Sequence, residues 1–388
     1  MNSVLAQLSD EHQVLAETVR DFANQVIAPV AGKHDREQTF PYEVIKQMGA
    51  MGLFGLPFPE EIGGMGGDFL SLCLTIEELA RIDQSVAVTL EAAVGLASMP
   101  IFRVGSTEQK EKFLPSLISG QALGAFGLTE PEGGSDASGL RTTALLESDE
   151  WVINGAKTFI TNSGTSITSL VILACSTGIK ADGSKEISTI IVPSGTPGFT
   201  VEPSYFKVGW HASDTHPLAF TDVHVPVSNL LGERGRGYAN FLQALDEGRI
   251  AIAALAVGAA QGCIDESLRY AKQRKAFGKL IGEHQSIAFK IAEMEARTHI
   301  ARLAYFHAAH LMAAGKDFKT QASIAKLVAS EAAMDNARAA TQIFGGYGFM
   351  DEYSVARHYR DSKILEIGEG TSEVQKILIA RSFGLSAE

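Results

Sequence analysis

The sequence predicts a multidomain α and β protein. It comprises an N-terminal all-α domain over residues 1–121, a central antiparallel β domain over residues 122–235 and a C-terminal four-helix bundle over residues 236–388. Three observations predict this order. The 388 residues exceed the roughly 100–200 of one typical domain. Apolar residues recur with a helical period at both ends of the chain. Between them lie short segments rich in Val, Ile, Thr and Phe.

The first zone, from Ser9 to about Gly120, has a helical pattern. In the first helix, apolar residues recur at intervals of three to five. A second helix is expected to begin at Pro41 in "PYEVIKQMGAMG", since proline suits the first helical turn. Further helices are predicted in "CLTIEELARID" and "TEQKEKFLPSLISG".

The central zone consists of strand-like segments separated by Gly, Pro, Asn and Asp, which is typical of an antiparallel sandwich or barrel. The predicted strands are "WVINGAKTFITN", "SLVILACST", "EISTIIVP", "GFTVEP" and "LAFTDVHVP".

The last zone returns to long helical patterns whose broad apolar faces and many alanines favour close packing and a homo-oligomer. The four predicted helices lie in "FLQALDEGRIAIAALAVGAAQGCIDESLRYAKQR", "SIAFKIAEMEARTHIARLAYFHAAHLMAA", "QASIAKLVASEAAMDNARAATQIFGG" and "SEVQKILIARSFG".

The charge of the chain limits its partners. A formal net charge of −12 argues against nucleic acid and against anionic membrane surfaces. The longest apolar run, residues 250–260, is shorter than the roughly 20 residues of a membrane span. The polar, acidic N-terminus does not resemble a signal or transit peptide, so we expect a cytoplasmic protein without membrane insertion. Cys73, Cys175 and Cys263 form no CxxC pair and are expected to be core residues in a reducing compartment.

Several chemistries lack their motifs. The sequence contains no GxGxxG after a strand, no P-loop, no HExxH and no GxSxG. His211 and His216 do not belong to a cluster with ligand spacing, so we expect no metal site.

Three segments are not explained by folding alone. The glycine-rich segment Phe126–Asp136, "FGLTEPEGGSD", can offer backbone N–H groups and hydroxyls to a ligand, or can be a plain loop before a strand. Arg274–Lys279, "RKAFGK", can clamp a diphosphate and cover a ring, or can be a solvated basic turn. Glu366–Glu373, "EIGEGTSE", places Glu369 between two glycines, which a helix interior would disfavour.

Taken together, these segments closely resemble the acyl-CoA dehydrogenase family of flavoproteins over nearly the whole chain. The motifs that carry the resemblance occur in the family's order: "AFGLTEPEGGSD", "INGAKTFITNS", "DEGRI", "RKAFGKLIGEHQ", "QIFGGYGF" and "RDSKILEIGEGTSEVQ". The resemblance implies the same three domains, a homotetramer, one non-covalent FAD per subunit, an acyl-CoA substrate and an electron-transferring flavoprotein as acceptor.

The resemblance also implies site residues. Glu369 aligns with the catalytic base that removes the α proton of the acyl thioester while hydride passes to flavin N5. The implied FAD-binding residues are Phe126, Leu128, Thr129, Gly134, Ser135, Phe159, Thr161, Arg274, Phe277, Gln342, Gly345, Gly346, Thr371 and Glu373. The implied substrate-binding residues are Glu91, Ser135, Asp246, Arg249, Gly368 and Gly370. Arg274, Phe277, Gln342, Gly345 and Gly346 are expected at the FAD of a neighbouring subunit.

The position of the base needs an argument, because the isovaleryl-type branch of the family carries its base on the first bundle helix. This chain has Gly248 at that position and Glu247 one residue away, which turns that carboxylate about 100° around the helix axis. We therefore expect Glu369 to be the base. Burial with bound substrate should raise the pKa of Glu369 toward the working pH.

A departure from the family pattern bears on the substrate. Much of the family has tyrosine immediately before the base, whereas this chain has Gly368. The space left, together with Glu91 at the expected floor of the acyl pocket, suggests a short or branched short-chain acyl-CoA; alternatively, Gly368 merely eases the turn.

Two other functions remain open. One is an acyl-CoA oxidase-like or nitroalkane oxidase-like enzyme that passes electrons to oxygen, although nitroalkane oxidation usually replaces the glutamate base with aspartate. The other is a non-catalytic acyl-CoA-binding scaffold, which would be expected to lose the base or the flavin loop.

Overall fold

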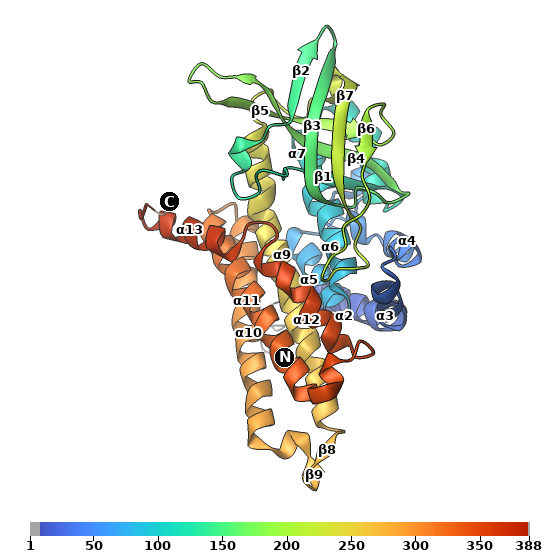
Figure 1. Ribbon diagram of the computed structural model, residues 1–388, viewed down its shortest axis with the longest axis vertical. Helices are drawn as coiled ribbons and strands as arrows, with labels where there is room; N and C mark the ends of the chain where they lie inside the picture. Colours follow the sequence, from blue (N-terminus) through green and yellow to red (C-terminus); the bar gives the residue numbers. More distant parts are fainter. Residues whose placement is uncertain (1–7, 387–388) are drawn as a thin grey trace.

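The computed structural model describes residues 8–386. Figure 1 shows the β domain at one end of the molecule and the long C-terminal helices running toward the other end, with the N-terminal helices beside them. The expected arrangement of an N-terminal helical domain, a central β domain and a C-terminal helical domain is confirmed.

The N-terminal domain is helical because its segments combine apolar faces with side-chain caps. Ser9 caps the first helix by accepting a hydrogen bond from the backbone N–H of His12, and Asp68 caps α5 in the same way through Ser71. Its α-helices are α2 (Asp10–Phe22), α3 (Ala28–Glu37), α4 (Tyr42–Ala50), α5 (Phe69–Ala80), α6 (Gln84–Glu91), α7 (Met99–Val104) and α8 (Thr107–Ile118).

The central domain is one sheet in the order β1-β4-β2-β3-β7-β6, with β5 paired to β4. The β2–β3, β3–β7, β4–β5 and β6–β7 pairs are antiparallel, as expected, whereas β1 and β2 both run parallel to β4. The parallel β1–β4 pair is possible because the β2–β3 hairpin forms a long connection between these two strands. The strands are β1 (Leu123–Gly127), β2 (Thr143–Glu147), β3 (Glu150–Thr161), β4 (Thr168–Ile179), β5 (Lys185–Pro193), β6 (Phe199–Val201) and β7 (Thr215–Pro226).

The C-terminal domain contains three long helices as predicted. They are α9 (Gly237–Ala271), α10 (Gln285–Ala313) and α11 (Lys319–Phe344). The remaining position is shared by two shorter helices, α12 (Ser354–Ser362) and α13 (Ser372–Ser382), of which α12 was not predicted. Between α9 and α10 the chain forms a small hairpin of β8 (Lys275–Ala276) and β9 (Lys279–Leu280), which Figure 1 shows at the end opposite the β domain.

Two helical stretches among the described residues, Gln84–Val104 and Gly237–Ala271, are long and apolar enough to cross a membrane. Their most apolar windows are 83% and 89% buried inside the protein, which is the pattern of core helices. The α9 helix is buried because α5, α10 and α11 all pack against it. Cys73, Cys175 and Cys263 are buried and free, in agreement with a role as core residues.

Candidate active site

Glu369 lies in a tight turn between α12 and α13. Its φ is +52° and that of Gly370 is +91°, so two successive residues adopt the left-handed region. A side chain at Gly370 would also collide with Gln375, so glycine is required there. Thr371 follows as the N-cap of α13, and its hydroxyl accepts a hydrogen bond from the N–H of Val374. Left-handed backbone at a non-glycine residue is a form of strain that concentrates at functional sites.

The carboxyl group of Glu369 fills a space on the α9 helix that exists because residue 248 is glycine. A Cβ atom at Gly248 would overlap Glu369 Oε2 and lie 3.6 Å from Leu96 Cδ2. Glu369 Oε2 has no accessible surface and no hydrogen-bond partner, although the residue as a whole is only partly buried. The glycine that the sequence places at the alternative base position therefore makes room for Glu369.

Glu91 is the second carboxyl group at this place. It is fully buried as the last residue of α6, where the chain changes to a π-helical turn over Ala92–Ser98. Neither of its carboxyl oxygens has a hydrogen-bond donor. Two carboxylates cannot hydrogen bond to each other, but a protonated carboxyl can donate to a carboxylate.

The pKa values of the pair agree with one shared proton. Burial raises the pKa of Glu91 far above its ordinary value, and the charge of Glu369 raises it further. Burial also raises the pKa of Glu369, but a hydrogen bond from Glu91 and the cations Lys326 and Arg249 lower it. These shifts favour a shared proton on Glu91 over one on Glu369.

Glu247 lies elsewhere. Its carboxylate forms an ion pair of 2.5 Å with Arg103 of α7, and the residue is buried. Burial raises the pKa of Glu247, while Arg103 opposes that shift. The Glu247 side chain therefore pairs with Arg103 and not with the Glu91–Glu369 pair. This agrees with its position one residue before Gly248, which turns it about 100° around the helix axis.

Asp246 and Arg249 stand one turn apart near the start of α9 and are both buried. The Arg249 guanidinium donates to Asp246, whose other oxygen lies 3.6 Å from Lys319 Nζ. Arg249 Nε has no partner within the described residues. The expected substrate-contacting pair therefore lies close enough to the Glu369 turn for the charge of Arg249 to act on it.

The segment Phe126–Asp136 begins in β1 and is held in place by two buried residues, Lys157 and Glu130. Lys157 Nζ donates to the Leu128 carbonyl (3.1 Å) and to Glu130 (2.8 Å). Glu130 also accepts from the N–H of Thr142 (2.9 Å). Phe126 packs against Phe241 of α9, which ties the loop to the helical domain. Beyond this anchor Gly134 and Ser135 are exposed, so their backbone is open to a ligand.

The end of β3 presents an aromatic ring to solvent. The β3–β7 register shifts between Lys157 and Ile160, and Phe159 within that bulge has a φ of +61°. Its side chain is 64% exposed, and its ring lies tilted by 40° against that of Tyr205, with 5.2 Å between the ring centroids. Thr161, the last residue of the strand, is partly buried. A bulge that turns a large apolar side chain outward makes a surface for a planar ligand.

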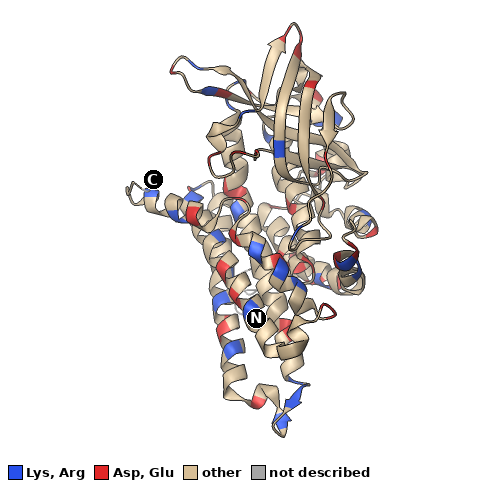
Figure 2. Ribbon diagram, in the orientation of Figure 1, with Lys and Arg blue, Asp and Glu red and all other residues tan. Residues whose placement is uncertain are grey.

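A second group of expected residues lies at the opposite end of α9. Arg274 and Phe277 belong to the β8–β9 hairpin, where Phe277 is 96% exposed and Arg274 lies 5.8 Å from the ring of Tyr347. Gln342, Gly345 and Gly346 are exposed close to the same tyrosine. Figure 2 shows the ribbon of this hairpin largely in the colour of Lys and Arg. Between Asp246 and Ala271 the helix rises about 38 Å, so one protomer does not bring the two groups together.

Two expected cofactor contacts have other partners in this structure. Thr371 caps α13, as described above, and Glu373 in the first turn of that helix is exposed. A hydrogen bond from its own backbone N–H lowers the pKa of Glu373 most, and a hydrogen bond from the Thr371 hydroxyl lowers it further. Both positions are near the Glu369 turn, but helix capping accounts for them.

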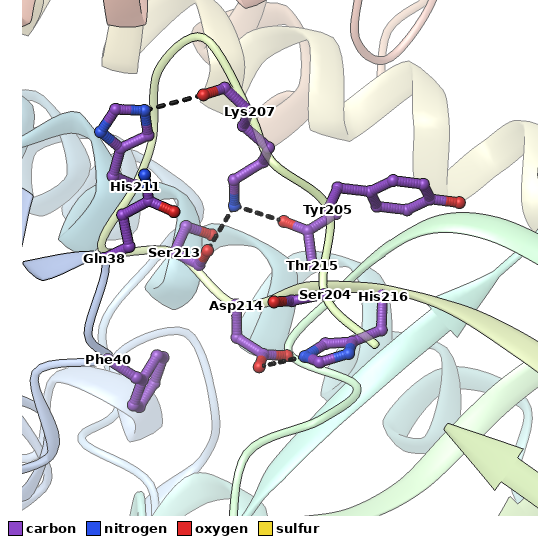
Figure 3. A pocket seen from close by; sticks show the side chains of 10 residues that line it. All are labelled: Gln38, Phe40, Ser204, Tyr205, Lys207, His211, Ser213, Asp214, Thr215 and His216. Carbon is purple, nitrogen blue, oxygen red and sulfur yellow. Dashed lines mark hydrogen bonds and ion pairs between the residues drawn. The ribbon is translucent and has the colours of Figure 1, made fainter. Parts of the chain in front are cut away.

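A cavity of about 100 Å³ lies between the loop after α3 and the chain around β6 and β7, and is shown in Figure 3. Lys207 crosses it, and its Nζ donates to Thr215 at 2.8 Å. His216 pairs with Asp214 at 2.9 Å, and His211 with Asp35 at 3.0 Å. Among residues 8–386, no group of three or more His, Cys, Asp or Glu side chains is placed to hold a metal ion. None of the predicted site residues lines this cavity.

Comparison with known proteins decides the family. The acyl-CoA dehydrogenase N-terminal, middle and C-terminal domains match residues 9–121, 125–223 and 235–384. The chain belongs to the acyl-CoA dehydrogenase family. It is 48% identical to a probable acyl-CoA dehydrogenase of Bacillus subtilis over 97% of this chain and 98% of that protein. It is accordingly an oxidoreductase that acts on a CH–CH bond.

Solved structures agree. The structure of butyryl-CoA dehydrogenase from Megasphaera elsdenii superposes with a TM-score of 0.93 at 43% identity, over 97% of this chain and 99% of that chain. A chain in a solved structure described as "Electron transferring flavoprotein of Acidaminococcus fermentans" superposes with a TM-score of 0.94 at 39% identity. The match covers 97% of this chain and 98% of that chain.

Acyl-CoA dehydrogenases are FAD-dependent, and the residues of this chain fit that cofactor. Phe159 offers an exposed ring at a backbone bulge, and the exposed residues Gly134 and Ser135 offer open backbone. At the far end, a Cβ atom at Gly345 or Gly346 would meet no other atom within 4 Å, which leaves space beside the cationic Arg274 for a phosphate-bearing ligand.

Several residues of this acyl-CoA dehydrogenase site could not be recognised from the sequence. Gly248 was noted only as a missing base, whereas it makes room for the carboxyl group of Glu369. Lys157 and Glu130 lie inside the recognised motifs, but their buried contact joins segments 27 residues apart. Lys326 and Gln375 both donate to the Gly370 carbonyl. Gln375 ends a recognised motif but was given no role, and Lys326 carried no signal beyond a helical pattern.

Proposed function

We propose that this chain is an FAD-dependent acyl-CoA dehydrogenase for short or branched short-chain acyl-CoA, with Glu369 as the base. The observation that carries the proposal is the enclosed Oε2 of Glu369 over Gly248, beside the buried carboxyl group of Glu91, whose pKa burial raises. An anionic carboxylate in an apolar enclosure is a stronger base than one in water, because burial raises its pKa.

The residues of the chain have separate tasks in the proposed reaction. Glu369 takes the α proton of the thioester, and its backbone N–H donates to the thioester oxygen, which acidifies that proton. Asp246 and Arg249 hold the CoA side, and Ser135 contacts the pantetheine arm. Bound FAD supplies the acceptor for the hydride of the β carbon. Holding these groups in fixed positions can lower the barrier by roughly 7–11 kcal/mol.

The proposed substrate range rests on Gly368. Its φ lies outside the left-handed region, and a Cβ would meet only Ile364, at 3.4 Å from the carbonyl oxygen. The turn therefore does not require glycine at this position, which weakens the alternative that Gly368 merely eases it. The likeness to a butyryl-CoA dehydrogenase supports a short acyl chain.

The base is tested by comparing Glu369→Gln with Glu247→Gln. Each purified variant is mixed anaerobically with butyryl-CoA and isovaleryl-CoA, and the loss of the yellow flavin colour is followed. We expect Glu369→Gln to retain FAD and lose bleaching, and Glu247→Gln to retain both. Bleaching by Glu369→Gln together with its loss in Glu247→Gln would contradict the assignment. The unmodified protein is also assayed with straight-chain thioesters of C4 to C16, and a preference for the long ones would contradict the substrate range.

The electron acceptor is proposed to be an electron-transferring flavoprotein, which the family resemblance and the Acidaminococcus fermentans match support. The alternative is an oxidase that uses oxygen. After anaerobic reduction by substrate, we expect slow recolouring in air and fast recolouring with an added electron-transferring flavoprotein. Fast recolouring in air alone would favour the oxidase. A colourless protein that does not take up FAD would favour a scaffold.

We also propose that Arg274 and Phe277 serve the FAD of a second copy in a homotetramer. The support is their placement about 38 Å along α9 from Asp246 and the near-complete exposure of Phe277. Arg274→Ala should lower FAD content and leave the mass in solution unchanged. Lys272→Ala, at the C-terminal end of α9, is the matched control. A monomeric, fully active protein would contradict the proposal.

A further inference from the structure

Lys326 is a fully buried lysine beneath the Glu369 turn. It lies on α11, is 0% exposed, and its Nζ donates to the Gly370 carbonyl at 2.7 Å. Burying an ammonium group is costly unless it is compensated by partners. Its hydrogen-bond acceptor here is a neutral carbonyl next to the proposed base, so the cation is retained at a place where its charge can act on Glu369.

The Gly370 carbonyl receives a second donor on the same side. Gln375, also 0% exposed, donates to it through Nε2 at 2.9 Å. These two bonds hold the peptide that follows Glu369, where both Glu369 and Gly370 have positive φ. A left-handed residue persists only when its surroundings hold it. Lys326 and Gln375 supply that restraint from inside the protein.

The electrostatic surroundings of the turn come from several elements. The charged or titratable groups that act on Glu369 or Lys326 are Glu91 of α6, Arg249 of α9, Lys326 of α11, Glu366 before the turn and Glu373 of α13. Burial lowers the pKa of Lys326 to about 8, while Glu369 opposes the shift most strongly. Lys326 is therefore still predominantly cationic at neutral pH.

We propose that Lys326 is a positioning residue for the reaction: its ammonium holds the Gly370 carbonyl, and with it the Glu369 turn, while its charge keeps Glu369 ionised. The inference rests on the proposed function, since it acts through Glu369 as base. It assigns two separable effects, one geometric and shared with Gln375, the other electrostatic and specific to Lys326.

The test compares Lys326→Met, which has similar length but neither charge nor donor, with Gln375→Leu, which loses only a neutral donor. The rate of anaerobic flavin reduction by butyryl-CoA is measured against pH, together with FAD content and the Kd of the substrate. Displacing a base by about 1 Å costs on the order of 100-fold, so both variants should reduce flavin roughly 100-fold more slowly. Only Lys326→Met should shift the acid limb of the profile upward, by about one pH unit.

Lys376→Met is the matched control. Lys376 lies on α13 near the same turn, but its side chain is 59% exposed and pairs with Glu331 at 3.9 Å. Its rate and pH profile should match those of the unmodified protein. A normal rate and an unshifted acid limb in Lys326→Met would overturn the proposal, and so would an equal shift in Lys376→Met. If Lys326→Met does not retain FAD, a normal rate in Gln375→Leu overturns the geometric part and a slow one supports it.

The two proposals fail in different ways. If Glu369→Gln reduces flavin as fast as the unmodified protein, the assignment of the base fails. If Glu369→Gln is inactive while Lys326→Met and Gln375→Leu are normal, Glu369 remains the base and only the role of Lys326 is lost.

Discussion

Replacing Gly248 by alanine tests the site without removing any functional group. The added methyl would overlap Glu369 Oε2, while its contact with Leu96 Cδ2, at 3.6 Å, is ordinary. The obstructing atom is the far end of a flexible side chain, so the carboxyl group can retreat and the helix can remain intact. We therefore expect a folded protein with a displaced base.

The substitution has two opposing effects on stability: it favours the helix, and it forces the Glu369 carboxyl group to move. Gly→Ala in a helix interior favours the helix by up to about 1 kcal/mol, which compensates part of the cost of moving the carboxyl group. A retreat of about 1 Å to ordinary contact should slow the chemical step on the order of 100-fold. That factor corresponds to about 2.7 kcal/mol of barrier. Activity should fall steeply while the Tm changes by about 2 °C or less.

The assay is anaerobic flavin reduction by saturating butyryl-CoA, with thermal unfolding measured on the same samples. Gly32→Ala is the control: it is a helical glycine in α3 whose Cβ would meet only the flexible end of Arg36, at 3.4 Å. It should leave the reduction rate unchanged. A Gly248→Ala protein that reduces flavin at the normal rate would refute the position assigned to Glu369.

Three further predictions concern other parts of the site. Because burial, and then Glu369, raises the pKa of Glu91, the folded protein holds a proton that the unfolded chain releases above pH 4.5, and stability falls as pH rises. Glu91→Gln removes this linkage, so its advantage in thermal unfolding should grow from about pH 5 to about pH 8, by at most about 1.4 kcal/mol per unit; a constant difference would contradict it. Lys157→Met leaves Glu130 buried without its cation and should cost about 3 kcal/mol and lower FAD retention, which denaturation and flavin absorbance would show. Gly368→Tyr should lower kcat/KM for isovaleryl-CoA about tenfold relative to butyryl-CoA, and equal losses for both would argue against a branched pocket.

Much of the fold followed from local patterns. The long helices α9, α10 and α11 and the strands β3, β4, β5 and β7 were predicted because each carries a sustained helical or strand pattern. β1 and β2 were missed, since both are short and lie beside glycine-rich or charged segments. The parallel pairing of β1 with β4 was missed because strand direction depends on a partner 45 residues away, at Leu123 and Thr168.

The residues of the site also fall into those that a local motif indicates and those whose role depends on a distant partner. Glu369, the segment Phe126–Asp136 and Phe159 could be proposed from the sequence because their residues form contiguous motifs. Lys326 was not, because its role depends on a hydrogen bond to Gly370 across 44 residues. The expectation that one protomer supplies only part of the FAD site came from the resemblance and stays a prediction; in the structure Arg274 lies far along α9 from Asp246.

The sequence by itself determined the order of the three domains and the family, and it singled out the carboxylate proposed as the base, because hydrophobic period and motif order are properties of neighbouring residues. Only the tertiary structure decided which groups surround that carboxylate. A pKa depends on burial and on charges a few ångströms away, and Glu91, Gly248 and Lys326 reach Glu369 from three different helices.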